Sequence, residues 1–156
     1  MTTSSQNPVV KKLRDAFPES LEEVGERHGL LSVTLPPNIL TAVAKLLRQD
    51  QLGNFNFLAD ITALDHYPRE PRFEVVYRLR SIPRRKELQL RVRISGNNPS
   101  LDSLTPLWPG AEAFEREVFD LFGIRFEGHP YLERILLPEN WKGHPLRKDY
   151  PVEGYR

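Results

Sequence analysis

The stretch RFEVVYRLRSIPRRKELQLRVRI (residues 72–94) decides the fold that this sequence predicts. Apolar and polar residues alternate through both of its halves. The apolar positions are Phe73, Val75, Tyr77, Leu79, Leu88, Leu90, Val92 and Ile94. Alternation with a period of two is the pattern of a half-buried β-strand, and the connecting PRRK suits a hairpin turn. The stretch therefore predicts a β-hairpin with one apolar and one polar face.

Two further strands are predicted upstream of this hairpin. LLSVTLPP (residues 30–37) predicts a strand that is stopped by two prolines. In NFNFLADITALDHY (residues 54–67) the period of two places five apolar residues on one side of a strand: Phe55, Phe57, Ala59, Ile61 and Ala63. These strands can extend the hairpin into a sheet.

Helical patterns surround the strands. Residues 11–17 form one helical segment, and residues 19–29 form a second one after Pro18. Residues 38–50 predict a further helix with Asn38 as its N-cap. Helical segments followed by a run of strands favour an α+β fold. We expect a two-layer sandwich, with helices packed on a mainly antiparallel sheet and a long extended C-terminal tail.

Three regions are predicted along the chain. A polar leader, residues 1–10, is expected to be disordered, and residues 11–124 are expected to form the α+β domain. Residues 125–156 contain four prolines and no sustained period, which predicts an extended tail rather than a helix. This predicted tail is richer in apolar residues than disordered tails are. We expect it to pack on the domain, on a partner subunit, or on both.

The composition excludes several classes of function. The chain has 156 residues, enough for one domain with a core, and its net charge of +1 gives no overall attraction to nucleic acid or anionic lipid. It has no cysteine, which excludes disulfides and thiolate ligation of zinc or an iron–sulfur cluster by this chain. No apolar stretch is long enough to span a membrane, so we expect any membrane association to run through a partner.

A helix is predicted for EREVFDLFGI (residues 115–124). On a helical wheel Glu115 lies on the shoulder of the apolar arc, between Phe119 and Phe122. A carboxylate there is partly desolvated, which costs free energy unless a cation pairs with it. Either the chain or another protein must supply that cation. The predicted tail offers the internal candidates, the LRKDY run above all: Arg134, Arg147 and Lys148, with Asp149 as a further acid.

The acidic residues of this helix do not form a catalytic pair. Glu115 and Glu117 are two positions apart and point about 200° away from each other, so they cannot act on one substrate. Glu117 and Asp120 share a face, and Arg116 with Asp120 is an i,i+4 pair. This pattern is typical of a solvated charged flank.

Other chemical motifs are weak. The tripeptide GHP occurs at residues 128–130 and 143–145, but metal ligands usually come in closer sets with carboxylates or thiolates. Histidine beside proline more often makes local hydrogen bonds. The sequence shows no glycine-rich phosphate loop after a strand and no nucleophile elbow.

The basic hairpin is the strongest rival to a purely structural interpretation. Residues 78–93 hold seven cations against Glu87 alone: Arg78, Arg80, Arg84, Arg85, Lys86, Arg91 and Arg93. Such a face can meet phosphates, as a nucleic-acid-binding domain would. However, the polar face has no aromatic residue on which bases could stack. A solvated face or a protein-docking face is therefore favoured.

Taken together, EREVFDLFGIRFEGHPYLERILLP (residues 115–138) and the later W-K-GHPLRKDYP closely resemble the C subunit of NADH-quinone oxidoreductase, respiratory complex I. The positions that match the signature of that family are Glu115, Arg116, Glu117, Asp120, Leu121, Phe122 and His129. The resemblance extends upstream to about residue 20. Two positions depart from the family pattern, namely Ala113, where an aromatic residue is usual, and Glu133, where a basic residue is usual.

The resemblance implies a role in assembly rather than chemistry. It implies a non-catalytic hydrophilic subunit in the peripheral arm of a translocase that couples electron transfer from NADH to quinone with proton translocation. Such a subunit packs against the D subunit near the quinone site and lies on the cytoplasmic side of the cell membrane. It binds no cofactor itself, while FMN, iron–sulfur clusters and quinone belong to the rest of the complex.

The resemblance also implies which residues hold the assembly together. Glu115, Arg116, Glu117 and Asp120 are expected to anchor the helix and its interface. The residues expected to fix the tail are His129, Arg134, Arg147, Lys148 and Asp149. An equivalent subunit of a membrane-bound hydrogenase or of a ferredoxin-fed dehydrogenase remains the nearest alternative.

Overall fold

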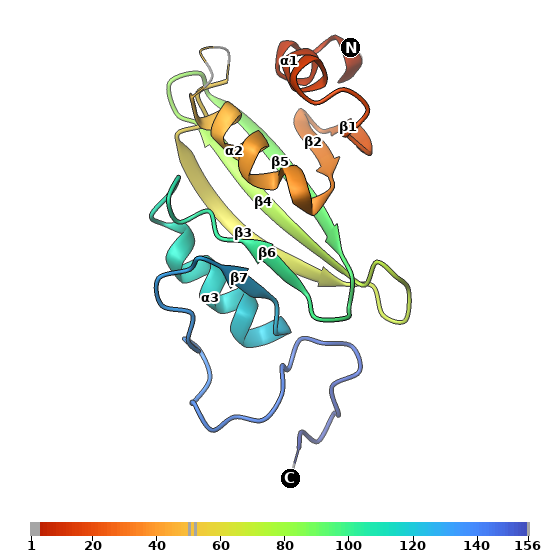
Figure 1. Cartoon of the computed structure of the whole chain (residues 1–156), viewed down its shortest axis with the longest axis vertical. Helices are drawn as coiled ribbons and strands as arrows, with labels where there is room; N and C mark the ends of the chain where they lie inside the picture. Colours follow the sequence, from red (N-terminus) through yellow and green to blue (C-terminus); the bar gives the residue numbers. More distant parts are fainter. Residues whose placement is uncertain (1–3, 50, 52, 156) are drawn as a thin grey trace.

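The computed structural model describes residues 4–49, 51 and 53–155, which fold into an α+β structure with two sheets (Figure 1). The larger sheet has five strands in the order β1-β2-β5-β4-β3, and the smaller one pairs β6 with β7. The strands are β1 (Glu23–Arg27), β2 (Leu30–Leu35), β3 (Phe57–Asp65), β4 (Phe73–Ser81), β5 (Lys86–Ile94), β6 (Ser100–Asp102) and β7 (Arg125–Glu127). The helices are η1 (Ser4–Gln6), α1 (Pro8–Ala16), η2 (Pro37–Ile39), α2 (Leu40–Gln49) and α3 (Ala111–Phe122).

Strands β4 and β5 form the predicted hairpin at the centre of the large sheet. Their antiparallel register places Tyr77 opposite Leu90 and Val75 opposite Val92. All eight alternating apolar residues of the hairpin are buried. Strand β2 pairs with β5 in parallel, whereas the other three pairings are antiparallel, so the predicted mainly antiparallel sheet is confirmed.

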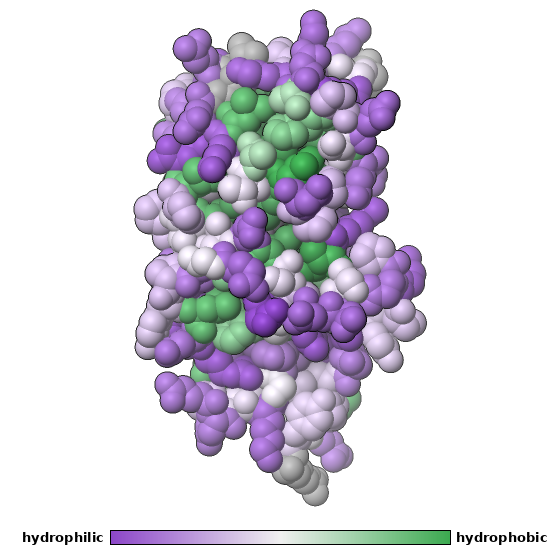
Figure 2. Space-filling view, in the orientation of Figure 1, coloured by the Kyte–Doolittle hydropathy of each residue, from purple (hydrophilic) through white to green (hydrophobic). Residues whose placement is uncertain are grey.

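The helices cover the apolar face of the large sheet. Figure 1 shows α2 and α3 on the same face, with α1 beyond the end of β1 and β2. All three helices contribute to one core with the sheet, through residues such as Leu13, Leu47 and Val118. On this face the surface has apolar patches over α2 and α3, separated by polar side chains (Figure 2). The predicted fold class, helices packed on one face of a sheet, is confirmed.

The opposite face of the sheet carries two cross-strand ion-pair groups. Glu87 lies between Arg80 and Arg78, with its carboxylate 3.3 Å from Nη2 of Arg78. Glu74 receives Nη1 of Arg91 at 2.7 Å and has Nε of Arg93 at 3.7 Å. Opposite charges on neighbouring strands stabilise a sheet modestly. The polar face of the predicted hairpin is therefore largely paired with itself.

Three differences from the predicted elements concern the N-terminal half. The segment 19–29 contains strand β1 instead of a helix, because Val24 pairs with Val33 and sheet pairing overrides the helix propensity of its glutamates. Asn38 lies inside the 3-10 turn η2, and α2 begins only at Leu40. In β3 a bulge between Leu58 and Asp60 breaks the period of two, so Phe57 is exposed and not buried.

The predicted boundaries of the leader and of the tail also differ from the structure. Helix α1 begins at Pro8, because the side chain of Asn7 accepts a hydrogen bond from the amide of Val9 at 2.9 Å. Residues 1–3 of the predicted leader lie outside the described residues. Residues 125–127, the start of the predicted tail, form β7, which pairs in parallel with β6. The C-terminal tail of the structure, residues 128–155, contains no helix or strand.

None of the helices in the described ranges is long and apolar enough to cross a membrane.

Candidate functional site: the junction of helix α3 and the tail

Helix α3 ends at a glycine that the C-terminal tail approaches closely. Gly123 has φ 74°, the left-handed conformation that favours glycine, and its amide donates to the carbonyl of Phe119. A Cβ atom at this position would lie 2.6 Å from Cδ2 of His144 and 2.7 Å from Nη2 of Arg147. Both neighbours belong to the tail, so Gly123 both ends the helix and makes room for the tail.

Asp120 holds the tail against α3. Its fully buried carboxylate accepts hydrogen bonds from three successive tail amides, those of Ile135 at 3.2 Å, Leu136 at 2.8 Å and Leu137 at 2.9 Å. It also accepts from Nη1 of Arg134 at 2.7 Å. Burial by itself raises the pKa of Asp120, but these hydrogen bonds outweigh it and the pKa is lowered. Asp120 is therefore an ionised structural anchor and not part of a solvated flank.

Two arginines extend this anchor along the tail. Arg134 also donates to the carbonyls of Asp120 at 3.2 Å, Gly143 at 2.9 Å and Trp141 at 3.2 Å. Arg116 donates to the carbonyls of Glu133 and Arg134 at 3.1 and 3.2 Å. The expected i,i+4 pair of Arg116 with Asp120 is absent, because Arg116 pairs with Glu112 at 3.4 Å and reaches the tail backbone.

The tail also caps the C-terminal end of α3. The last carbonyls of a helix have no partner within the helix and carry partial negative charge. Here the carbonyl of Asp120 lies 2.9 Å from Nδ1 of His144, the Leu121 carbonyl accepts the Leu146 amide at 3.1 Å, and the Phe122 carbonyl accepts Nε of Arg147 at 2.6 Å. Burial lowers the pKa of His144, so it donates as a neutral imidazole. The tail thus satisfies the helix end that it covers.

Glu115 is fully buried, beyond the partial desolvation that its place on the helical wheel predicts, and its predicted partners are wrong. Its carboxylate accepts from the hydroxyl of Ser103 and the amide of Leu104, both at 2.7 Å, in the loop after β6. Nε2 of His129 lies 4.0 Å away. Arg134 and the LRKDY run lie instead at the Asp120 end of the helix. Burial raises the pKa of Glu115, against the hydrogen bonds from Ser103 and Leu104.

His129 ties the start of the tail to the first turn of α3. Its Nε2 lies 3.0 Å from the carbonyl of Glu112, and its Nδ1 accepts the amide of Tyr131 at 2.9 Å. A carbonyl can only accept, so Nε2 carries the proton and the ring is neutral. His129 and His144 therefore make separate backbone contacts. The described residues contain no group of three or more His, Asp or Glu able to hold a metal ion.

The far end of the tail is clamped to the sheet by Arg72, which no local pattern of the sequence singles out. Arg72 binds Asp65 with two hydrogen bonds of 2.9 Å, and Asp149 with bonds of 2.6 and 3.3 Å. Asp65 also accepts the amide of Lys148 at 2.8 Å. Burial raises the pKa of Asp65, but the hydrogen bonds from Arg72, Lys148 and Tyr67 lower it to about 2. Lys148 thus acts through its backbone, and Asp149 through its carboxylate.

The structure brings most of the predicted site residues together. Asp120, Arg134 and Arg147 lie at the C-terminal end of α3, and Glu115 and His129 lie near its start. Arg116 pairs with Glu112 and binds the tail carbonyls of Glu133 and Arg134. Glu117 is half-buried, and no hydrogen bond or ion pair joins its side chain to another described residue. No local pattern of the sequence pointed to Arg72 or Asp65 as site residues. The contact that joins Arg72 to Asp149 spans 77 residues of the chain.

The tail presents large apolar side chains to solvent although its backbone is fixed on α3. The exposed members are Tyr131, Ile135, Leu136, Trp141, Leu146, Val152 and Tyr155. Figure 1 shows the tail running beyond α3 at the end of the molecule away from the N-terminus. Exposed apolar surface of this extent on an ordered segment is typical of a protein interface.

Comparison with known proteins identifies the family. Residues 33–156 match the family described as respiratory-chain NADH dehydrogenase, 30 Kd subunit. The C subunit of NADH-quinone oxidoreductase from Roseiflexus sp. (strain RS-1) is 51% identical over 92% of this chain and 83% of its own length. That of Citrifermentans bemidjiense is 42% identical over 97% of this chain and 92% of its own.

Two solved structures share the fold. The trypsin-resistant fragment (1-134) of Nqo5 is 38% identical, with a TM-score of 0.66 over 78% of this chain and 97% of its own. A chain of the membrane-bound sulfane sulfur reductase, an archaeal respiratory membrane complex, is 27% identical, with a TM-score of 0.78 over 92% of this chain and 84% of its own. The chain therefore belongs to the C-subunit family of NADH-quinone oxidoreductase, the 30 Kd subunit of respiratory-chain NADH dehydrogenase.

Proposed function

We propose that this chain is a non-catalytic scaffold of the peripheral arm of NADH-quinone oxidoreductase, and that its tail docks on the D subunit near the quinone site. In this proposal the chain binds no cofactor. FMN, the iron–sulfur clusters and quinone are held by other subunits, which carry electrons from NADH to quinone with coupled proton translocation. The complex places the chain at the cytoplasmic side of the cell membrane.

One observation carries this proposal: an irregular segment is held rigidly in place and yet turns apolar side chains outward. Asp120 accepts three amides of the tail, while Leu136 is 58% exposed and Trp141 is 41% exposed. Folding alone does not require these side chains, because they add little to the core. A preordered segment loses less conformational entropy on binding, which favours its use as a docking surface.

The bonding of the titratable residues supports a structural role. The carboxylates of Glu115 and Asp120 are both buried, and each is bound to backbone amides of the same chain. A catalytic acid or base must instead reach a substrate in a cleft. Among the residues that match the family signature, Glu115, Arg116, Asp120 and His129 therefore supply internal anchors for α3 and the tail.

A second candidate is the equivalent subunit of a related respiratory complex. The likeness to a chain of the sulfane sulfur reductase complex favours it. That match covers 92% of this chain, which is more than the share of the chain that precedes the tail, residues 1–127. The match thus includes part of the tail. The two candidates share the docking role and differ in the chemistry of the whole complex.

The proposal is tested by native electrophoresis of gently solubilised membranes from the source organism, probed for this chain and stained for NADH dehydrogenase activity. Co-migration with a large NADH-oxidising band that contains the D subunit is the expected result. A large band without NADH activity favours the second candidate. A chain that runs alone in the soluble fraction contradicts both.

A matched pair of variants tests the docking surface itself. Leu136→Asp places a charge on the exposed side of the tail and is expected to reduce co-migration with the D subunit. Leu64→Asp places the same charge on the exposed side of β3 and is expected to leave assembly unchanged. Equal assembly of both variants contradicts docking through the tail.

A further inference from the structure

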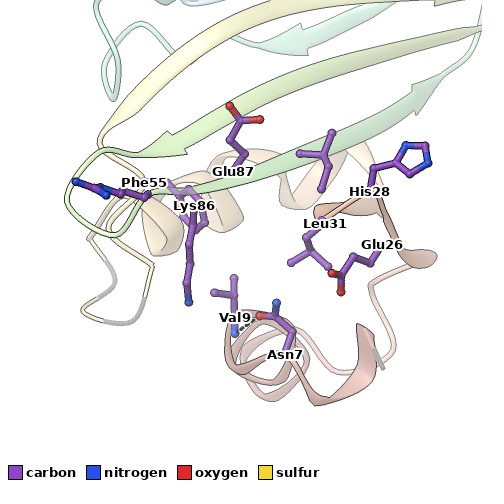
Figure 3. Close-up of a pocket in the computed structure, with 11 residues that line it drawn as sticks. Asn7, Val9, Glu26, His28, Leu31, Phe55, Lys86 and Glu87 are labelled. Carbon is purple, nitrogen blue, oxygen red and sulfur yellow. Dashed lines mark hydrogen bonds between the residues drawn. The ribbon is translucent and has the colours of Figure 1, made fainter. Parts of the chain in front are cut away.

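The turn between β4 and β5 forms a basic projection with a hollow on each side. We call residues 82–86 the basic turn. One hollow of about 340 Å³ lies between the turn, α1 and the β1–β2 turn, and its apolar lining consists of Val9, Leu30, Leu31 and Phe55 (Figure 3). A more open hollow of about 530 Å³ is lined on the other side by Ser81 and Ile82. Arg85, Lys86 and Glu87 line both hollows.

Charge is concentrated strongly around this turn. Residues 78–93 hold seven of the 22 basic residues of the chain and one of its 21 acidic residues. The rest of the chain therefore holds fifteen basic and twenty acidic residues. A near-neutral protein with one strongly basic element has a local attraction for acidic partners.

The cations of the basic turn are not neutralised within the chain. Glu87 is occupied by Arg78 and Arg80 on the polar face of the sheet. Figure 3 shows the carboxylate of Glu87 turned away from α1, whereas the amino group of Lys86 extends into the space between the hairpin and α1. Within the described residues no ion pair or hydrogen bond joins the side chains of Arg84, Arg85 or Lys86 to another group.

The backbone at this end is held in uncommon conformations. Arg85 has φ 51°, and His28, on the β1–β2 turn across the hollow, has φ 52°. Residues other than glycine pay free energy for this left-handed region, and such strain gathers at functional sites. Both residues line the hollow beside α1.

We propose that the basic turn and the hollow beside α1 dock an acidic segment of a second protein. The carboxylates of that segment meet Arg84, Arg85 and Lys86, and an apolar side chain enters the hollow against Leu30, the partly exposed apolar residue of its lining. Glu26 lies on the facing wall and directs the carboxylates toward the turn. The lining exposes no Phe, Tyr or Trp on which bases could stack, since Phe55 is 1% exposed, and this favours a polypeptide over nucleic acid.

This site is separate from the docking surface of the tail. Figure 1 places the β4–β5 turn and the C-terminus at opposite ends of the molecule. The chain then bridges two partners, one at each end. This inference stands whichever respiratory complex contains the chain.

The test uses the full-length chain and a fluorescein-labelled peptide in which glutamates surround a central pair of leucines. Fluorescence anisotropy gives its Kd for the wild type, for Arg84→Glu/Lys86→Glu, and for the control Lys45→Glu/Lys142→Glu. The control reverses two exposed charges outside both hollows, so the net charge of the two variants is equal. We expect the first pair to weaken binding by about tenfold or more, and the control pair by less than about twofold.

Three outcomes overturn the proposal. The first is the absence of saturable peptide binding, and the second is an equal loss of binding in both variant pairs. The third is tighter binding of a single-stranded oligonucleotide, or of phosphatidylglycerol vesicles, than of the peptide. Replacement of the two leucines by glutamine is expected to weaken binding, because the hollow is then left unfilled. Unchanged binding of that peptide contradicts the role of the hollow.

Discussion

Arg134 and Asp120 form a buried ion pair between the C-terminal tail and helix α3, with Nη1 of Arg134 2.7 Å from Oδ1 of Asp120. The side chain of Asp120 is fully buried and that of Arg134 is 14% exposed. Removing only one partner of such a pair costs much free energy of folding, because the remaining charge stays buried without a counterion. The same carboxylate also fixes three tail amides, so the pair controls the path of the whole tail.

Asp120→Asn is expected to release the tail from α3. Asparagine keeps the shape but removes the charge, and its NH₂ group cannot accept the hydrogen bonds that the second oxygen accepts. We expect the tail to lose about 2 kcal/mol or more of local stability. Tryptic cleavage after Lys142 and Lys148, followed by mass spectrometry, should then be about 30-fold faster than in the wild type.

Glu117→Gln is the matched control for this prediction. It removes one carboxylate from the same helix, but no hydrogen bond of Glu117 to another described residue is lost. Its tail is expected to be cleaved at the wild-type rate. If both variants were cleaved at the same rate, the tail would not be held by Asp120.

Glu115 is expected to make the protein less stable as the pH rises above the ordinary pKa of a glutamate. Burial raises its pKa in the folded state, so the folded protein binds more protons than the unfolded chain between the two pKa values. The free energy of unfolding must then fall with rising pH across that interval. Urea denaturation at a series of pH values from about 4.5 to about 8 measures this contribution.

Glu115→Gln should remove this contribution without collapse of the site. The glutamine oxygen can still accept the amide of Leu104, and its NH₂ group can donate to the hydroxyl of Ser103. The stability of the variant should therefore depend less on pH than that of the wild type. If the free energy of unfolding changed with pH in the same way for both proteins, Glu115 would have the same pKa in the folded and the unfolded state, which would contradict the prediction. Glu115→Ala, in contrast, leaves the Leu104 amide unpaired and should cost about 2–4 kcal/mol.

Gly123→Ala is expected to destabilise the protein by more than the strain of an alanine in the left-handed conformation alone. Its added Cβ would lie 2.6 Å from His144 and displace the tail. Gly128→Ala is the control, because Gly128 has φ 83° and open space around its Cβ position. We expect about 1 kcal/mol for Gly128→Ala and about 2–4 kcal/mol for Gly123→Ala, measured by urea denaturation. Equal losses would mean that the tail does not contact Gly123.

Arg72→Ala is expected to be far more destabilising than Asp149→Asn, although both break the same pair. The alanine variant leaves Asp65, which is 6% exposed, without its cation, at a cost of about 3–5 kcal/mol. Asp149 is 43% exposed on its side chain, so its loss should cost less than about 1 kcal/mol. Thermal or urea denaturation distinguishes the two, and similar losses would contradict the clamp.

The same clamp predicts a stability change in acid. The pKa of Asp65 is lowered from 3.8 to about 2, so its ionised form contributes stability above about pH 4. This contribution is lost as the pH falls from about 4 to about 2. In Arg72→Ala the hydrogen bonds from the arginine are gone, so the pKa of Asp65 in the folded state lies closer to its pKa in the unfolded chain. The variant should therefore lose less stability than the wild type across this pH interval, and unfolding curves measured between about pH 2 and about pH 6 check the difference.

Alternation and helical periodicity predicted the parts of the fold that local patterns determine. The hairpin at residues 72–94 is an example, because its apolar face has to be buried whatever covers it. The helical wheel likewise predicted that Glu115 is partly desolvated, and the structure buries it fully. Strand β1 was missed because its glutamates and arginine favour a helix, and only pairing with β2 makes it a strand.

The contacts that fix the tail could not be predicted, because each depends on the path of the folded chain. Asp65 and Lys148 are 83 residues apart, and no local pattern connects them. Glu115 was assigned to the tail cations, yet Ser103, twelve residues before it, supplies its hydrogen bond. The helical wheel gives the direction of a side chain on its helix but not the element that meets it.

The most direct test of how the tail is held is hydrogen exchange, measured by NMR on the isolated full-length chain at about pH 7. We predict slow exchange for the amides of Ile135, Leu136 and Leu137, because Asp120 binds all three, and faster exchange for these amides in Asp120→Asn. Exchange of the three wild-type amides at the rate of an unfolded chain would contradict the claim that α3 orders the tail before any partner binds.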